Sequence, residues 1–176
     1  VVCETTSNIS VNNVVRNADS VIPLLNGTAD YIPEIVITLG KQIVSKKLKQ
    51  FLHEKPRIHW DIPPGSSWGR AWAMFGNIFD PIEPVNEMQF LHSIADTTEP
   101  DENNFKTEWL KKSEQANGRT KKYFETIPFS DLKVFETLVN SFPHNSQIQY
   151  GNSTPVRYSN FFEHHYSVNC FSNRGT

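Results

Sequence analysis

The chain has 176 residues, of which 38% are hydrophobic, 12% aromatic and 20% charged, and its formal net charge is −2. This composition excludes an intrinsically disordered chain, which would be poorer in aromatic residues and richer in charge. No run of about 18 consecutive apolar residues occurs, so we expect no membrane span. Because 17 basic residues stand against 19 acidic ones, the chain lacks the basic field of nucleic-acid-binding proteins, and we expect no nucleic-acid partner.

The two cysteines, Cys3 and Cys170, stand near opposite ends of the chain and match no metal-ligand spacing. Two cysteines do not make a disulfide framework, so we expect two reduced, buried thiols in a cytoplasmic protein. The chain begins at Val1 without a methionine and stops at Thr176 without a closing element. We therefore expect it to be an excised piece of a longer protein.

The first third of the chain predicts a strand–helix–strand unit. Residues 1–3 form a short apolar run that predicts a buried strand feeding a loop, and residues 34–40 (EIVITLG) predict a second buried strand. An apolar stripe at helical spacing follows it, formed by Val44, Leu48, Phe51 and Leu52. Residues 57–62 (RIHWDI) predict the next strand. Short connections of this kind are typical of a βαβ unit in a parallel sheet.

The middle of the chain is less regular. Residues 61–86 contain four prolines and predict a long surface excursion, while residues 80–102 carry seven acidic side chains and no lysine or arginine. This acidic stretch predicts a solvated face, with a partner-binding surface as the alternative. Residues 105–123 predict a long exposed helix. Ser130 and Asp131 can cap a further helix with its stripe at Leu132, Phe135, Leu138 and Val139, ending before Pro143.

The last part of the chain predicts two strands that each end in a polar loop. Residues 146–150 predict a strand that runs into residues 151–157 (GNSTPVR), where Ser153 is a natural helix N-cap and Pro155 suits the first helical turn. Residues 167–171 predict another strand, which enters residues 172–175 (SNRG). The first loop carries Arg157 and the second carries Arg174.

These two loops predict a binding site for an anionic small molecule. Ligands of open parallel sheets bind beyond the carboxyl ends of the strands, and a guanidinium can hold a carboxylate or phosphate by two parallel hydrogen bonds. The helix start near Ser153 adds partial positive charge. The alternative is two surface arginines beside a capped helix. Lys46 begins the earlier helix; the basic residues around it favour a solvated face, but Lys46 could also point into a cleft.

Familiar catalytic motifs are absent from the sequence. It contains no P-loop, no glycine-rich dinucleotide motif, no CxxC and no HExxH, and no nucleophile–histidine–acid arrangement is evident. His164 and His165 are adjacent, and adjacent side chains point apart, so we expect no shared metal there. We predict no catalytic and no metal-ligating residue in this chain.

The paired segments GNSTPVR (151–157) and SNRGT (172–176) closely resemble the paired motif of the 2-succinyl-5-enolpyruvyl-6-hydroxy-3-cyclohexene-1-carboxylate (SEPHCHC) synthases, thiamine-diphosphate-dependent enzymes of menaquinone biosynthesis. The family motif continues into Gly-Ile-Asp-Gly, which this chain lacks after Thr176. Residues 34–62 are similar to the strand–helix–strand of the family's central domain, and residues 1–8 resemble an earlier strand and loop there. Residues 62–126 match no motif of the family.

The resemblance implies a fold class and a domain plan. The complete enzyme has three α/β domains, each with a mostly parallel sheet between helices on both faces. Residues 1–126 would be an N-terminally truncated central domain, and residues 127–176 the start of a C-terminally truncated diphosphate-binding domain.

The resemblance also implies a reaction and a set of substrate-binding residues. The family decarboxylates 2-oxoglutarate on thiamine diphosphate and adds the resulting carbanion to isochorismate, giving SEPHCHC. Asn152, Ser153 and Arg157 match substrate-binding positions of the first motif, and Arg174 matches one in the second. Lys46 matches a central-domain lysine that reaches the substrate.

Cofactors and partners follow from the same resemblance. The full-length enzyme would use thiamine diphosphate and Mg²⁺ and would form a homodimer or homotetramer, since its site lies between domains of different subunits. The glutamate that activates the cofactor and the segment that holds the metal belong to other parts of the family's chain. We therefore expect this piece alone to hold no cofactor and to be inactive. The alternative function is a non-catalytic α/β binding or scaffold module with an anion site.

Overall fold

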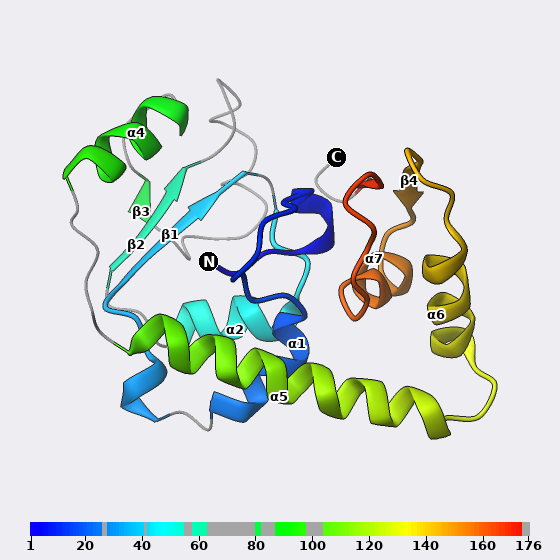
Figure 1. The fold of residues 1–176 in the computed structure, drawn as a ribbon. Helices are drawn as coiled ribbons and strands as arrows, with labels where there is room; N and C mark the ends of the chain where they lie inside the picture. Colours follow the sequence, from blue (N-terminus) through cyan, green and yellow to red (C-terminus); the bar gives the residue numbers. More distant parts are fainter. Residues whose placement is uncertain are drawn as a thin grey trace.

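The strands of the molecule form two parallel sheets joined by helices (Figure 1). The structure, a computed structural model, describes residues 1–25, 28–40, 42–54, 58–62, 80–81, 87–97 and 104–173. The predicted surface excursion falls almost wholly on residues 63–79 and 82–86, which lie outside these ranges, as does Arg174. Short parallel strands alternating with helices confirm the predicted α/β class.

The first sheet contains the predicted strand–helix–strand unit. Strand β1 (Ile35–Leu39) pairs in parallel with β2 (Ile58–Ile62), and helix α2 (Lys46–Glu54) connects them. Strand β3 (Asp80–Pro81) adds to the far side of β2. Leu48, Phe51 and Leu52 are buried on one side of α2, because their spacing places them on one helical stripe.

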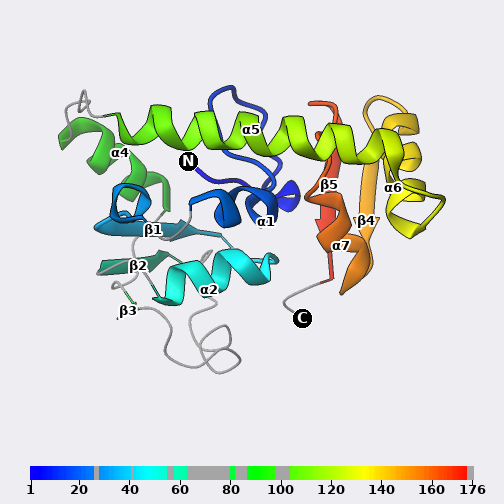
Figure 2. The same cartoon turned by 90° about the horizontal axis from the view of Figure 1, so that it is seen from below.

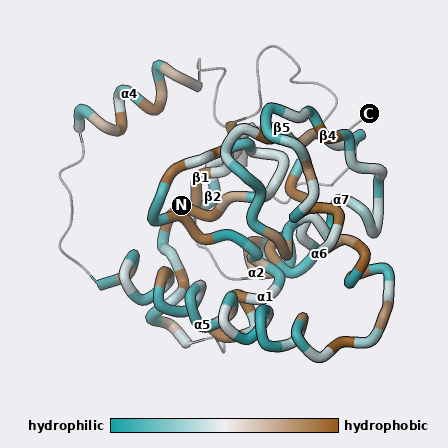
Figure 3. The backbone as a smooth tube through the Cα atoms, turned by 45° about the vertical axis from the view of Figure 1, so that its right-hand side comes forward, coloured by the Kyte–Doolittle hydropathy of each residue, from teal (hydrophilic) through white to brown (hydrophobic). Residues whose placement is uncertain are grey.

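Helix α5 (Phe105–Thr126) lies along the first core instead of standing exposed (Figures 1 and 2). Its buried stripe consists of Trp109, Ser113, Ala116 and Phe124, and the ring of Trp109 meets Phe51 of α2 edge to face, with centroids 5.9 Å apart. The predicted long helix is confirmed and many of its residues are exposed, but the buried stripe was not predicted. Figure 3 shows hydrophilic and hydrophobic residues alternating along α5, as expected of a helix with one buried face.

Three short elements precede the first sheet and complete its core. Helix α1 (Ala18–Val21) continues into the 3-10 helix η2 (Ile22–Leu25), and η3 (Ala29–Tyr31) follows. Val21 and Leu25 are almost fully buried and belong to the same cluster as α2 and α5. This cluster forms the larger of the two hydrophobic cores.

Both faces of the first sheet carry helices. Val36 of β1 packs against the core that contains α1, α2 and α5. Trp60 of β2 contacts Phe90 of α4 (Glu87–Thr97), with ring centroids 6.4 Å apart. Helix α4 lies within the acidic stretch. Ile35, Ile37 and Leu39, the alternate residues of β1, remain 37–49% exposed.

The second sheet follows helix α6 (Asp131–Ser141), whose predicted cap is confirmed because the Ser130 hydroxyl accepts from the backbone N–H of Lys133 at 3.4 Å. Strand β4 (Gln147–Tyr150), helix α7 (Thr154–Ser159) and strand β5 (Asn169–Ser172) form a second parallel unit. Tyr150, Val156 and Cys170 form its core. The prediction of two neighbouring strands with a helix between them is confirmed.

The N-terminal segment differs from the predicted strand. Residues 1–3 form only an isolated parallel bridge, between Val2 and Val15, and a 3-10 turn η1 (Thr5–Ser7) follows. Cys3 and Cys170 are both buried free thiols, as predicted. Burial raises the pKa of both thiols, that of Cys170 to about 11. Among the described residues, no helix is long and apolar enough to cross a membrane.

Candidate functional site

The carboxyl ends of β4 and β5 meet at one edge of the second sheet. Tyr150 pairs with Ser172 in the parallel register, so the chain leaves both strands on the same side. The side-chain amide of Gln149 donates to Asn173 Oδ1 at 2.6 Å, which ties the loop after β5 to β4. Asn173 is the last described residue, and the predicted site residue Arg174 follows it outside the described part. The sequence argument that these two loops begin side by side is confirmed up to Asn173.

The turn between β4 and α7 carries two predicted site residues, Asn152 and Ser153, and both are exposed. Ser153 has φ 71° and ψ −120°, a conformation that costs a non-glycine residue about 1–3 kcal/mol. It occupies the N-cap position, as predicted, but its side chain accepts no capping hydrogen bond. The reason is geometric, because a capping residue normally needs extended backbone angles. Pro155 stands in the first helical turn, as predicted.

Arg157 presents a half-buried cation without a counterion. It lies on α7 beside Val156 and close to Ser159, which are fully buried and hold the helix against the sheet. Its Nε is buried and has no hydrogen-bond partner, and no ion pair joins the guanidinium to another described residue. A partly desolvated, unpaired guanidinium is costly unless an anion completes it. Among the described residues, Arg157 is therefore the strongest candidate for binding an anion.

Lys46 is the first residue of α2 and its side chain is exposed. Two residues earlier, Val44 is buried in the core of the second sheet, together with Tyr150 and Val156. The chain just before α2 thus packs against the unit that carries Arg157, and Figures 1 and 2 both show the N-terminal end of α2 on the side of α7. The structure brings Lys46, Asn152, Ser153 and Arg157 to neighbouring elements. It gives no direct contact between Lys46 and the other three.

Glu4 holds the two residues that lead into α2 and was not predicted to have a role in the site. Its Oε2 accepts from the N–H of Val44 at 2.7 Å, and its Oε1 accepts from the N–H of Ser45 at 2.6 Å. Burial raises the pKa of this carboxyl group, although the two backbone hydrogen bonds and Lys49 oppose the shift and Asp19 adds to it. No local pattern could have revealed this contact, since 40 residues separate Glu4 from Val44.

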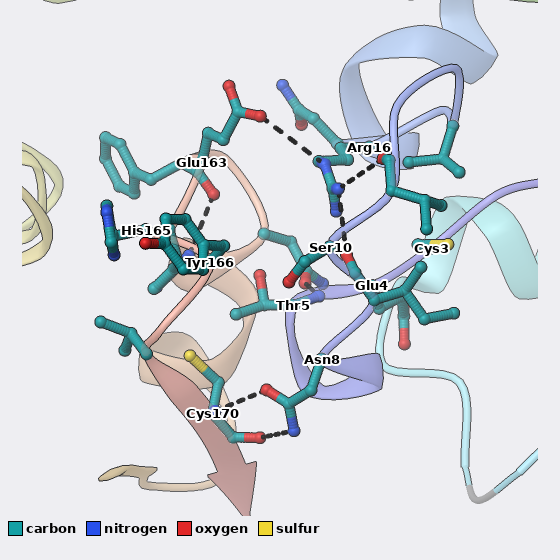
Figure 4. A pocket seen from close by; sticks show the side chains of 18 of the residues that line it. Cys3, Glu4, Thr5, Asn8, Ser10, Arg16, Glu163, His165, Tyr166 and Cys170 are labelled. Carbon is teal, nitrogen blue, oxygen red and sulfur yellow. Dashed lines mark hydrogen bonds and ion pairs between the residues drawn. The ribbon is translucent and has the colours of Figure 1, made fainter. Parts of the chain in front are cut away.

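A cavity of about 750 Å³ lies elsewhere, between residues 3–17 and residues 160–170 (Figure 4). Lys46, Asn152, Ser153 and Arg157 do not line it. Its arginine, Arg16, already donates to the carbonyls of Ile9 (3.0 Å) and Val11 (3.3 Å), and its Nε lies 3.9 Å from Glu163. The guanidinium of Arg16 is thus engaged within the protein, whereas the Nε of Arg157 at the sheet edge has no hydrogen-bond partner.

The histidines near the cavity are engaged with protein groups. Nε2 of His164 lies 2.7 Å from the Tyr150 hydroxyl, and burial lowers the pKa of His164 while raising that of Tyr150. The ring of His165 stacks on that of His144, with centroids 3.9 Å apart. Within the described ranges, no group of three histidine, cysteine, aspartate or glutamate side chains could hold a metal ion. We therefore assign no metal or cofactor contact to these residues.

Known proteins are similar to this chain along its whole length, and they carry the family name that the paired motif suggested. The SEPHCHC synthase of Flavobacterium psychrophilum is 36% identical over 182 residues, a match that covers 100% of this chain and 32% of the relative. That of Flavobacterium johnsoniae is 34% identical over 179 residues, covering 100% of this chain and 31% of the relative. That of Porphyromonas gingivalis is 29% identical over 179 residues, covering 98% of this chain and 31% of the relative.

These matches confirm the resemblance read from the sequence. They extend it over residues 62–126, where no motif pointed to the family. The chain spans about a third of the length of the curated relatives it matches. No family model matches the chain.

Proposed function

Because the chain is homologous throughout its length to a segment of the SEPHCHC synthases, we propose that it supplies substrate-binding residues to such an enzyme. The reaction we propose joins 2-oxoglutarate, after its decarboxylation, to isochorismate. The observation that carries the proposal within the structure is Arg157, a half-buried guanidinium whose Nε has no partner. It lies on α7, the helix that follows the carboxyl end of β4, and ligands of parallel sheets bind at such strand ends.

The charges of the proposed substrates fit this edge of the sheet. Both 2-oxoglutarate and isochorismate are dicarboxylates, and a guanidinium can hold a carboxylate by two parallel hydrogen bonds. We propose that Arg157 binds one substrate carboxylate in this way and that Arg174 does the same from the loop after β5. Asn152 and Ser153 would add neutral hydrogen bonds from the exposed turn. Lys46 would supply a point charge from α2.

Thiamine diphosphate, with Mg²⁺, would supply the carbon nucleophile in this enzyme class. The described residues include no metal-binding group of three, so they do not fit that role. We propose that they act on the substrates alone and that other parts of the protein hold the cofactor. We further propose that residues 127–176 begin the diphosphate-binding domain, which agrees with α5 ending at Thr126 and the second sheet following it.

The test is the substitution of Arg157 in the complete, cofactor-loaded enzyme, with the product of 2-oxoglutarate and isochorismate as the readout. Arg157→Ala should lower kcat/KM by a factor that corresponds to about 2–5 kcal/mol of lost transition-state binding if the side chain binds a buried carboxylate. Arg157→Lys should recover only part of this loss, because an ammonium cannot form the two parallel hydrogen bonds. An unchanged kcat/KM in Arg157→Ala would refute the assignment of this residue.

Measurements on the complete wild-type protein also distinguish the synthase from the alternative function, a non-catalytic binding module. A non-catalytic binding module would bind a dicarboxylate, measured by calorimetry, without forming product from the two substrates. Turnover by the complete wild-type enzyme would exclude the binding-module function. Binding of the dicarboxylate without turnover would favour the binding module over the synthase.

A further inference from the structure

We infer that the segment Cys3–Asn8 is a clamp that fixes the two residues leading into α2 against the β4–α7–β5 unit, and that Glu4 is thereby a positioning residue for Lys46. The inference deepens the proposed function and rests on it, since it assigns Lys46 to substrate binding. The clamp contacts themselves stand on hydrogen bonds that reach two separate parts of the molecule.

The first contact of the clamp is with α2. Both carboxylate oxygens of Glu4 are used, each accepting one backbone N–H at 2.6–2.7 Å, from Val44 and Ser45. These N–H groups immediately precede Lys46, so two consecutive peptide groups before it are fixed by one side chain. Hydrogen bonds to a carboxylate are stronger than those to a neutral acceptor. Glu4 therefore sets the direction in which α2 begins.

The second contact is with the other unit. The N–H of Thr5 donates to Asn160 Oδ1 at 2.9 Å, and the Thr5 hydroxyl donates to the Ser159 carbonyl at 3.0 Å. Asn8 then exchanges two hydrogen bonds with the backbone of Cys170 in β5, as the dashed lines of Figure 4 show. Four hydrogen bonds thus attach the segment to the end of α7 and to β5.

The clamp is itself rigid. The backbone N–H and the hydroxyl of Ser7 both donate to the Glu4 carbonyl, at 2.9 and 2.6 Å, and the N–H of Asn8 donates to the Thr5 carbonyl at 3.3 Å. These bonds close the turn η1 between the residue that holds α2 and the residue that holds β5. A displacement of one unit is therefore transmitted to the other through only five residues of tightly turned chain.

This arrangement matters because Lys46 and Arg157 stand on the two units that the clamp joins. A dicarboxylate held at both ends needs two cations at a fixed separation, and positioning of the binding groups before the substrate arrives lowers the entropic cost of binding. Loss of the clamp should consequently weaken binding, with little change in the chemical step. A residue that only stabilised the fold would not act through Lys46.

The test is a double-mutant cycle of Glu4→Gln and Lys46→Ala in the complete enzyme. Glutamine keeps one acceptor oxygen and places a donor where the second N–H needs an acceptor. The helix should stay folded, because the Ser45 hydroxyl still accepts from the N–H of Leu48 at 3.0 Å and donates to Asp19 at 2.8 Å. Hydrogen exchange at the amides of Val44 and Ser45 should become about tenfold faster in Glu4→Gln, reporting the loosened contact directly.

We expect each single substitution to raise the KM of the same substrate by about tenfold, with kcat changed by no more than about threefold. The double variant should be no worse than Lys46→Ala alone, since a lysine that is absent cannot be misplaced. Glu4→Asp, with a shorter side chain, should fall between the wild type and Glu4→Gln. Leu25→Ala removes buried volume from the core that η2 shares with α2 but removes no hydrogen bond of the clamp, so it is the control for lost stability and should leave both KM values unchanged.

If the increases in KM of the two single variants multiply in the double variant, or if KM is unchanged in Glu4→Gln, the inference is overturned. The proposed function would remain intact in both cases. An unchanged KM in Lys46→Ala would overturn it by removing the residue that Glu4 positions. Absence of turnover in the wild type would refute the proposed function itself, and the exchange rates of Val44 and Ser45 would then still decide whether Glu4 holds α2.

Discussion

The side-chain amide of Asn8 takes the place of a neighbouring strand on β5. Its Nδ2 donates to the Cys170 carbonyl at 3.0 Å and its Oδ1 accepts from the Cys170 N–H at 2.6 Å, although 162 residues separate the two. This exchange reproduces the pair of bonds that two backbones make in an antiparallel sheet. The other edge of β5 pairs with β4, so Asn8 and β4 hold the strand from opposite sides.

Substitution of Asn8 by glycine should destabilise the protein by about 1–3 kcal/mol, because two hydrogen bonds to a part-buried backbone are lost. The loss should appear although Asn8 has φ 53°, a conformation that glycine adopts at less cost. Denaturant unfolding measures the change. Asn13→Gly is the matched control, since Asn13 has φ 61° and is exposed; its stability should stay equal or rise slightly. Equal effects at both positions would show that the bonds to Cys170 contribute nothing.

Substitution of Ser153 by glycine should separate the cost of its strained backbone from the proposed role of its hydroxyl in substrate binding. Glycine tolerates the positive φ of 71°, so the free energy of unfolding should rise by about 1 kcal/mol, equivalent to about 2–4 °C in Tm for a chain of this size. If the hydroxyl binds substrate as proposed, KM should rise in the same variant. Calorimetry and steady-state kinetics on one preparation would show both. A lower Tm would mean that the serine side chain stabilises the turn.

Stability should fall in mild acid because of His164. Burial lowers the pKa of this imidazole in the folded protein, with Arg16 adding to the effect and the Phe162 carbonyl opposing it. As pH falls, the unfolded chain therefore takes up a proton at this histidine before the folded protein does. The contribution of neutral His164 to stability is complete above its ordinary pKa of 6.5 and is lost as pH falls from there through the lower pKa of the folded protein.

Unfolding free energies between pH 7.5 and pH 5 test this dependence. In His164→Gln the slope over this range should be shallower than in the wild type, even though the hydrogen bond with Tyr150 is weakened at every pH. His165→Gln, at the exposed neighbouring position, is the control. Equal slopes in the wild type and His164→Gln would show that other groups cause the acid dependence.

The elements that sequence reasoning located are those encoded by local patterns. The β-branched run at residues 34–40, the stripe of Leu48, Phe51 and Leu52, and the Ser130 cap each depend on neighbours within one helical turn or one strand. The paired motif located the turn at Asn152 and Ser153 in the same way. Their positions therefore follow from periodicity and capping preferences alone.

The features that sequence reasoning missed depend on distant or small residues. Helix α5 was expected to be exposed because Ser113 and Ala116, which fill its buried stripe between Trp109 and Phe124, do not register as a hydrophobic pattern. Residues 1–3 read as a strand, yet they find only one bridging partner, Val15. The hydrogen bond between Glu4 and Val44 spans 40 residues, and no local window contains both ends of that contact.

The clamp also has a consequence for the order in which the molecule is made. Cys3–Asn8 leave the ribosome well before their partners on α7 and β5, which come from residues 159–170. At about 5–20 residues per second, the N-terminal segment waits roughly ten to thirty seconds for them during synthesis. Until then other chains can reach the polar groups of this segment. They can also reach the edge of β1 with its exposed isoleucines. The nascent chain should therefore depend on chaperones more than its short local elements suggest.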